Sequence, residues 1–223
     1  TARICVSILP RTVPEALQLI ERAESAQADL IEVRLDRLED CLGNLEALRD
    51  VAAHGKTPKI ATDRASRSET EQRQLLLDAC KSGFEYIDAE LSMPQLDAVV
   101  KELKRLGVKT IVSYHKFDGF LSLPELNRVL DREIASGADI CKIVATAKKI
   151  EDNLTVLNFV SAAASKTKLV CFCMGELGKI SRLLSPLFGG FFTFAALERG
   201  SETAAGQMTI QEMKAAYALL GQR

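Results

Sequence analysis

The sequence predicts a single α/β domain with the architecture of a (β/α)8 TIM barrel. Short runs rich in β-branched and apolar residues alternate with longer amphipathic runs, and this alternation repeats eight times. The chain has 223 residues, of which 47% are hydrophobic, enough for one well-buried core. Because no linker, charge block or low-complexity segment divides it, we expect one catalytic domain over residues 1–223.

The eight candidate strands are short and bounded by turn residues. They lie at 4–9, 29–35, 58–64, 85–91, 109–115, 139–145, 168–174 and 191–197. An open doubly wound sheet uses the same alternation and is the alternative architecture. We favour the barrel because eight units close a ring and because no GxGxxG motif follows the first strand.

The segments between the strands carry helix signals. Residues 122–137 open with a capping box formed by Ser122 and Glu125, which satisfies amide groups at a helix start. Further amphipathic patterns lie at 13–26, 152–165 and 209–220. Strand and helix patterns therefore alternate as the barrel requires.

The composition excludes several classes of protein. With 29 basic and 30 acidic residues, the net charge of −1 creates no bulk field for nucleic acid or an anionic membrane. Trp is absent, so a base-stacking platform is not expected. No apolar run approaches the roughly 18 residues of a membrane span. We therefore expect neither a nucleic acid nor a membrane as partner.

The cysteines and histidines indicate a reduced protein without a metal. Six cysteines are spread along the chain without a CxxC pair, which is typical of free thiols in the cytoplasm. The two histidines, His54 and His115, lie in unlike contexts far apart in the sequence, so we expect no metal site. The first residues have the wrong length and flanks for a signal peptide.

Ionisable residues occupy the barrel-facing side of five consecutive candidate strands. Side chains alternate between the two faces of a strand, so in 29–35 the apolar set Ile31, Val33 and Leu35 faces the helices. Glu32 and Arg34 then point into the barrel. The same reasoning turns inward Arg64, Asp88, Glu90, His115 and Lys142. Most of them stand near the carboxyl ends of the strands, where barrel enzymes build their active sites.

Lys142 is the most unusual member of this inward set. It lies in the apolar run DICKIVA at 139–145, and burying an unpaired ammonium group there costs several kcal/mol. A dry environment and neighbouring cations such as Arg34 and Arg64 would favour the neutral amine, which condenses with a carbonyl group. Lys142 is therefore the candidate for a Schiff base with a ketone or aldehyde.

The remaining inward residues complete this chemistry. His115 is the natural base for removing a proton next to the imine, and Glu32 could orient it or share the proton transfer. The arginines suit a carboxylate on the substrate. Residue types and spacing thus indicate Schiff-base chemistry on a small oxo acid, but they leave aldol cleavage and dehydration open. A buried salt-bridge network, an aldolase acting on a sugar phosphate and an inactive barrel used for binding remain alternatives.

Several segments resemble the type I 3-dehydroquinate dehydratase family over nearly the whole chain. The segments are IEVRLD at 31–36, SYHKFD at 113–118, MGELGKISR at 174–182, FGGFFTFAAL at 188–197 and TAAGQ at 203–207. Lys142 also follows His115 by 27 residues, as the lysine and histidine of the family do. The resemblance implies syn elimination of water from 3-dehydroquinate to give 3-dehydroshikimate, in the shikimate pathway of aromatic amino-acid biosynthesis.

The resemblance also implies a role for each residue. Lys142 would form the imine at the C3 ketone, His115 would take the C2 proton and return it to the leaving hydroxyl, and Glu32 would assist. Arg182 would hold the substrate carboxylate. The remaining predicted binding residues are Arg34, Arg64, Gln207 and Thr203, together with Phe172 and Met174, which would pack the substrate ring. No metal or organic cofactor is expected, because the imine is itself the electron sink.

Two segments depart from the family pattern. After Arg64 the family usually has a Glu-Gly-Gly run, whereas this chain reads RASRSETEQ, so that carboxylate is missing or shifted to Glu69. In TAAGQ, Thr203 and Ala205 replace the usual Ser and Pro. Asp88 and Glu90 are expected mainly to form salt bridges with the arginines. We expect a homodimer, and a fused shikimate dehydrogenase, known in some members of the family, stays open.

Overall fold

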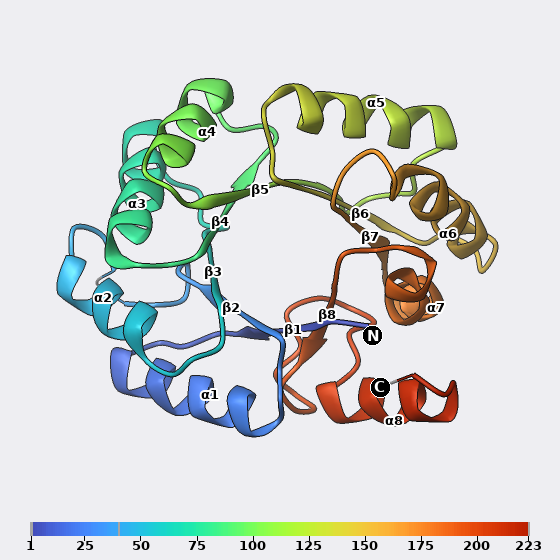
Figure 1. The fold of residues 1–223 in the computed structure, drawn as a ribbon, viewed down its shortest axis with the longest axis horizontal. Coiled ribbons are helices and arrows are strands. Elements are labelled where there is room, and N and C mark those ends of the chain that lie inside the picture. Colours follow the sequence, from blue (N-terminus) through green and yellow to red (C-terminus); the bar gives the residue numbers. More distant parts are fainter. Residues whose placement is uncertain (1, 40, 223) are drawn as a thin grey trace.

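Eight parallel strands and their connecting helices form a barrel in the computed structural model, which describes residues 2–39 and 41–222 (Figure 1). The strands are β1 (Ile4–Ile8), β2 (Leu30–Arg34), β3 (Lys59–Thr62), β4 (Tyr86–Glu90), β5 (Lys109–Lys116), β6 (Ile140–Thr146), β7 (Leu169–Met174) and β8 (Thr193–Ala196). All eight predicted strands are present, shifted by one or two residues at their ends. The predicted barrel is confirmed.

The helices form the outer ring of the molecule. They are α1 (Val13–Ser25), α2 (Leu45–Ala53), α3 (Glu69–Ser82), α4 (Leu96–Arg105), α5 (Leu123–Ala135), α6 (Asp152–Ala163), α7 (Lys179–Leu184) and α8 (Ile210–Leu219). The predicted capping box of Ser122 and Glu125 starts α5, and a similar box of Ser68 and Glu71 starts α3. The seventh unit departs from the regular pattern, because α7 is short and lies between two 3₁₀ helices, η1 (Glu176–Gly178) and η2 (Ser185–Phe188).

The strands follow one another around the barrel in sequence order, with β1 pairing β8. The remaining junction, between β7 and β8, has no ladder in the described residues. There the Phe191 amide donates a 2.7 Å hydrogen bond to the Leu169 carbonyl. The ring is therefore closed by ladders at seven junctions and by an isolated bond at the eighth.

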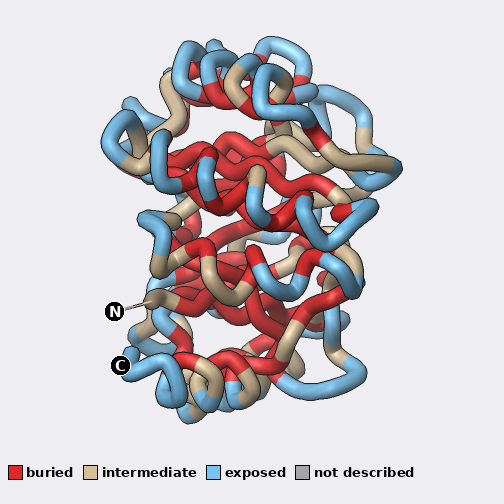
Figure 2. Tube along the Cα trace, turned by 90° about the vertical axis from the view of Figure 1, so that its right-hand side faces the viewer, coloured by how far each residue is buried: buried red, intermediate tan, exposed pale blue. Residues whose placement is uncertain are grey.

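Two apolar clusters stabilise the barrel. The larger lies between the sheet and the helices, and Figure 2 shows buried strands at the centre with exposed outer faces of the helices. The smaller lies inside the barrel and includes Leu30, Ile60, Ile111 and Ile140. Cys141, Cys171 and Cys173 belong to the outer cluster and are core residues, as their predicted helix-facing position implies.

The interior changes from apolar to polar over one step along the strands β2 to β6. Two residues beyond Leu30, Ile60, Tyr86, Ile111 and Ile140 stand polar or ionisable side chains. They are Glu32, Thr62, Asp88, Ser113 and Lys142, all buried. Because adjacent side chains on one face of a strand stand two residues apart, these groups form a polar layer directly above the apolar one.

None of the helices in residues 2–39 and 41–222 has the length and apolar character that crossing a bilayer requires. Within the same residues, no group of three or more His, Cys, Asp or Glu side chains is arranged to hold a metal ion.

Candidate active site

A cavity of about 360 Å³ opens above the polar layer, at the carboxyl ends of the strands. All ten predicted catalytic and binding residues line it: Glu32, Arg34, Arg64, His115, Lys142, Phe172, Met174, Arg182, Thr203 and Gln207. A cavity of this size suits a small ring compound. The structure thus brings the predicted residues together, while their individual roles remain predictions.

Lys142 projects into this cavity from β6 and is only 4% exposed. Its Nζ lies 3.1 Å from Asp88 Oδ2, 3.7 Å from Glu32 Oε1 and 4.2 Å from the centre of the Phe194 ring. Its direct contacts are therefore carboxylates, and Arg64 is bound to the same Asp88 carboxylate. An effect of the arginines on the amine stays a prediction. This environment holds an ammonium ion without a free buried charge, because two anions and an aromatic face compensate it.

Asp88 anchors the base of the site from β4. Its Oδ1 accepts a 2.6 Å hydrogen bond from the Ser113 hydroxyl and lies 2.9 Å from Arg64 Nη2, while Oδ2 faces Lys142. Burial favours the neutral acid, but Arg64 and Lys142 outweigh it and hold the pKa of Asp88 well below its ordinary value. Asp88 is therefore a carboxylate between two cations.

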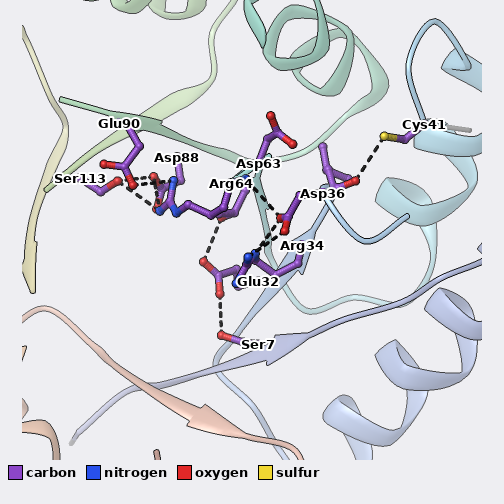
Figure 3. Close-up of polar contacts among 12 residues, drawn as sticks. Ser7, Glu32, Arg34, Asp36, Cys41, Asp63, Arg64, Asp88, Glu90 and Ser113 are labelled. Carbon is purple, nitrogen blue, oxygen red and sulfur yellow. Dashed lines mark hydrogen bonds and ion pairs between the residues drawn. The ribbon is translucent and has the colours of Figure 1, made fainter. Parts of the chain in front are cut away.

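Glu32 lies on β2 and is the second carboxylate near the Lys142 amine. It accepts hydrogen bonds from Ser7 Oγ at 2.6 Å and Thr62 Oγ1 at 3.0 Å, and Figure 3 shows it above Ser7. Burial raises its pKa, but the ammonium of Lys142 and the Ser7 hydroxyl lower it further, so that the pKa of Glu32 is below its ordinary value. Glu32 is thus an anion within reach of the amine.

His115 stands at the upper end of β5, and its partner is Glu90. The imidazole Nδ1 lies 2.9 Å from Glu90 Oε1, and the ring stacks on Phe117 with the ring centroids 5.7 Å apart. The interpretation that Glu32 orients this imidazole is therefore wrong, because Glu32 contacts Ser7, Thr62 and Lys142 instead. A share of Glu32 in the proton transfer stays a prediction. Burial, aided by Lys142, lowers the pKa of His115, which favours a neutral imidazole at neutral pH.

Arg34 and Arg64 are both engaged in ion pairs. Arg34 Nε and Nη2 each donate a 2.8 Å hydrogen bond to the carboxylate of Asp36. Figure 3 shows Arg64 extending towards Asp88 and Glu90, whose carboxylates lie 2.9 and 3.2 Å from its guanidinium nitrogens. The predicted salt bridges of the β4 carboxylates with an arginine are present. Contact of these arginines with a substrate stays a prediction.

Arg182 differs from these arginines because its charge has no carboxylate partner in the part of the chain that the structure describes. It projects from α7, is 1% exposed, and its guanidinium stacks 4.3 Å above the Phe172 ring. Its Nε and Nη2 are buried and make no hydrogen bond within residues 2–39 and 41–222. Burial lowers the pKa of Arg182 to about 10, so the group is still cationic at neutral pH. An unpaired buried cation facing a cavity fits an anionic ligand.

The loop between β8 and α8 covers one side of the cavity. Thr203 donates its backbone amide to Gln207 Oε1 at 2.7 Å, and the Ala205 carbonyl accepts the Gly175 amide at 3.0 Å. Gly206 has a φ of +75°, and a Cβ placed there would lie 2.1 Å from the Gly175 carbonyl oxygen. Only glycine permits this contact, which seats Thr203 and Gln207 against β7.

The loop after β3 supplies no carboxylate to His115. Ser68 and Glu71 form the capping box of α3, and Glu69 accepts a hydrogen bond from Gln95 at the surface. The possibility that Glu69 replaces the missing family carboxylate is therefore wrong. Gln72 of the same helix does line the cavity.

Comparison with known proteins identifies the family. The family model described as type I 3-dehydroquinase matches residues 4–223. The chain belongs to this family. A 3-dehydroquinate dehydratase of Desulfotalea psychrophila is 34% identical, with the match covering 97% of both chains, and one of Dehalococcoides mccartyi is 37% identical over 92% of this chain and 90% of the relative. The predicted family, the enzyme class and the reaction on 3-dehydroquinate are thereby confirmed.

Solved structures of 3-dehydroquinate dehydratases have the same fold. The Geobacillus kaustophilus enzyme superimposes with a TM-score of 0.88 and 28% identity, covering 99% of this chain and 91% of that one. The Clostridium difficile type I enzyme, solved with covalently modified comenic acid, also gives 0.88, with 26% identity and coverage of 98% and 92%.

Sequence reasoning missed several direct contacts in the site. It placed Asp88 and Glu90 on the inner face but did not connect them to Lys142 and His115. The alternation in EYIDAEL at 85–91 was the available signal, since it puts both carboxylates on the face shared with those residues. Ser7, which binds Glu32, had no signal beyond its inward position on β1.

Proposed function

We propose that this chain dehydrates 3-dehydroquinate through an imine between the substrate ketone and Lys142. Family membership establishes the reaction, and the proposal assigns its steps to residues. Lys142 is the lysine of the chain that combines burial, a position at the carboxyl end of a barrel strand and a cavity in front of its amine. These features favour a covalent role over a structural one.

The amine attacks the C3 carbonyl after it loses a proton, and loss of water then leaves a protonated imine. The iminium carries the same positive charge as the ammonium, so Asp88 at 3.1 Å and Glu32 at 3.7 Å stabilise it without rearrangement of the site. The cation draws electrons from the neighbouring C2–H bond. This is the chemistry that an organic cofactor supplies elsewhere, and none is required here.

His115 performs the proton transfers. Its Nδ1 faces Glu90, so Nε2 is the nitrogen available to a ligand in the cavity. A neutral imidazole accepts the C2 proton and then donates it to the departing hydroxyl, after which hydrolysis of the imine releases 3-dehydroshikimate and the free amine. One base serving both events matches a syn elimination, because both groups leave from one face of the ring.

The observation that carries the assignment of the substrate is the unpaired guanidinium of Arg182. A buried cation without an anion is costly, and a substrate carboxylate would satisfy both of its free nitrogens. Phe172 and Met174 line the adjacent wall and would pack against the ring, while Arg34, Arg64, Thr203 and Gln207 surround the remaining hydroxyls. The cavity therefore combines an anion site with a reactive amine.

Borohydride reduction during turnover tests this assignment. It should fix the ligand mass on the peptide that contains Lys142, and Lys142→Ala should fold but lose both label and turnover. His115→Ala should still be labelled, while its turnover falls by roughly 10²–10⁴, the usual cost of removing a general acid–base group. Lys149→Ala, an exposed neighbour in the chain, is the matched control. Label on another lysine, or rapid turnover by His115→Ala, would contradict the assignment.

We further infer a homodimer in the cytoplasm. The exposed apolar side chains Ile150, Leu154, Leu177 and Ile180 support the first proposal, since they lie on α6, η1, α7 and the loop before α6. The free state of all six cysteines agrees with a reducing compartment. Sedimentation at several concentrations measures the assembly, and Leu154→Glu should shift it to the monomer if the apolar patch is the interface.

A further inference from the structure

We propose that Glu90 is the positioning residue of His115, holding the imidazole in the tautomer whose Nε2 accepts the substrate proton, and that Arg64 fixes Glu90 in place. This inference rests on the proposed function of His115. It concerns a carboxylate from β4, in a chain whose loop after β3 offers none to the imidazole.

The contact between the two side chains determines the tautomer. Glu90 Oε1 lies 2.9 Å from His115 Nδ1, and both side chains are largely buried. A carboxylate accepts hydrogen bonds but donates none, so the proton of a neutral imidazole must reside on Nδ1. Nε2 then carries the lone pair, and the ring to which it belongs lines the cavity. The base is thus prepared before the substrate arrives.

Arg64 makes Glu90 a fixed partner. Its Nη1 lies 3.2 Å from the same Oε1, and its Nη2 is anchored by Asp88 at 2.9 Å and by Ser113 at 3.2 Å (Figure 3). Asp88 and Ser113, on the two neighbouring strands, therefore restrain the guanidinium, which in turn pairs with the Glu90 carboxylate. A supporting residue that restrains an orienting group also restrains the orientation of the catalytic side chain itself.

The other acidic residues on and near the cavity form hydrogen bonds with partners other than His115. Glu32 accepts from Ser7 and Thr62, and Asp63 accepts two contacts from Arg67 Nε. Glu69 and Glu71 belong to the surface and to the cap of α3. Within the described chain, Glu90 is therefore the carboxylate that contacts the imidazole.

The tautomer can be measured on the unmodified protein, with one variant needed only for assignment, because the chain has two histidines. Nitrogen-15 labelling of histidine gives two rings in an NMR spectrum, and His115→Gln assigns them. At a pH where the imidazole is neutral, His115 should show a protonated Nδ1 and an unprotonated Nε2. His54, whose Nε2 lies against Glu21 at the surface, is the internal reference. A protonated Nε2 on neutral His115 would overturn the proposal.

Kinetics of Glu90→Gln test the consequence for catalysis. Loss of the anion should lower kcat by at least about 10-fold, the scale for removing a group that orients a histidine, while KM changes little. The charged groups near His115 are Glu90, Lys142, Arg64 and Asp88, and Glu90 is the anion that contacts the ring and raises its pKa. The acidic limb of the pH profile should therefore move to lower pH in Glu90→Gln. A purely structural role would lower stability and leave this limb in place.

Two controls separate this proposal from the proposed function. Glu69→Gln makes the same chemical change at the surface and should leave kcat and the acidic limb unchanged, while Glu90→Asp should recover part of kcat. If the limb of the unmodified enzyme survives in His115→Ala, then His115 is not the base and the proposed function fails. If the limb depends on His115 but Glu90→Gln has normal kcat and pH profile, only the role of Glu90 is refuted.

Discussion

The two halves of the barrel interior differ in whether their buried cations are paired with carboxylates. On β2 to β6, each cation that lines the cavity has a carboxylate within 3.2 Å, as in the pairs of Arg34 with Asp36, Arg64 with Asp88 and Lys142 with Asp88. On the side of β7 and β8 the lining is aromatic, with Phe172 and Phe194, and the cation there, Arg182, has no anion among the described residues.

The presence or absence of a paired carboxylate distinguishes the groups proposed to carry out the chemistry from Arg182, which is proposed to bind the ligand. Paired charges are held in place before the substrate binds, and their desolvation is compensated within the protein. The charge of Arg182 is compensated only when an anion binds. The unfavourable burial of this cation in the free enzyme is then relieved, and this relief contributes to the binding free energy. The two halves should therefore respond with opposite signs when a cation is removed.

The largest effect on stability is expected for Arg64→Met. The substitution leaves Asp88 and Glu90 buried without their common cation, which should cost about 3–5 kcal/mol of unfolding free energy. Urea denaturation of the free enzyme measures it. Arg67→Met serves as a comparison, since it removes one pair with Asp63 outside the polar layer. An Arg64→Met enzyme as stable as the parent would show that the charged half is not held by its ion pairs.

Arg182→Met should have the opposite effect on the free enzyme. Replacing an unpaired buried guanidinium by an apolar side chain of similar length should raise the unfolding free energy by about 1–3 kcal/mol. Substrate binding should weaken by roughly 10²-fold or more, the scale for removing one member of a buried charge pair. A ring ketone without a carboxylate should bind the variant and the parent alike. Loss of stability in Arg182→Met would remove the contrast between the halves.

Glu133 provides a smaller test of the comparison, because it is an unpaired buried acid whereas Arg182 is an unpaired buried cation. This residue of α5 is 0% exposed, and both carboxyl oxygens lack a hydrogen-bond partner in residues 2–39 and 41–222. Burial raises the pKa of Glu133 well above its ordinary value, so it is held as a neutral acid. Unlike Arg182, it does not line the active-site cavity.

The pH dependence at Glu133 has a definite sign. The folded state binds this proton over a pH range in which the unfolded state has lost it, so the contribution to stability declines as pH rises above about 4.5. Glu133→Met should therefore be more stable than the parent, by about 1–3 kcal/mol near pH 8 and by less near pH 5. Thermal unfolding at the two pH values measures this. Asp131→Asn, exposed on the same helix, should show no such trend.

Much of the fold and of the site's composition was predictable from the sequence. Alternating apolar and amphipathic runs predicted the eight strands, and alternation within each strand placed Glu32, His115 and Lys142 on the inner face. These patterns are local, so the printed sequence contains them. The role of Arg182 in the site was predicted from the family resemblance alone. Arg182 stands on the short helix α7, and the direction of its side chain depends on how that helix packs against the barrel.

The pairing of charges could not be predicted in the same way. Which carboxylate meets which cation depends on the register between strands, where Glu90 lies opposite Ser113 and one inward step below His115. Register follows from packing of the whole barrel and leaves no local pattern. For that reason Glu32 was assigned to the imidazole, and Glu90, one strand away from it, was assigned to the arginines alone.

The isolated bond between Phe191 and Leu169 at the β7–β8 junction has a consequence for hydrogen exchange. A strand amide in a continuous ladder exchanges only when several bonds open together, whereas a single bond opens alone. The Phe191 amide should therefore exchange with deuterated water faster than amides of the β5–β6 ladder. Arg182 lies beside this junction, because its carbonyl accepts a 2.6 Å hydrogen bond from the Thr193 hydroxyl of β8. Slower exchange of the Phe191 amide in the presence of ligand would then report that the bound anion, held by Arg182, draws the two edges of the barrel together.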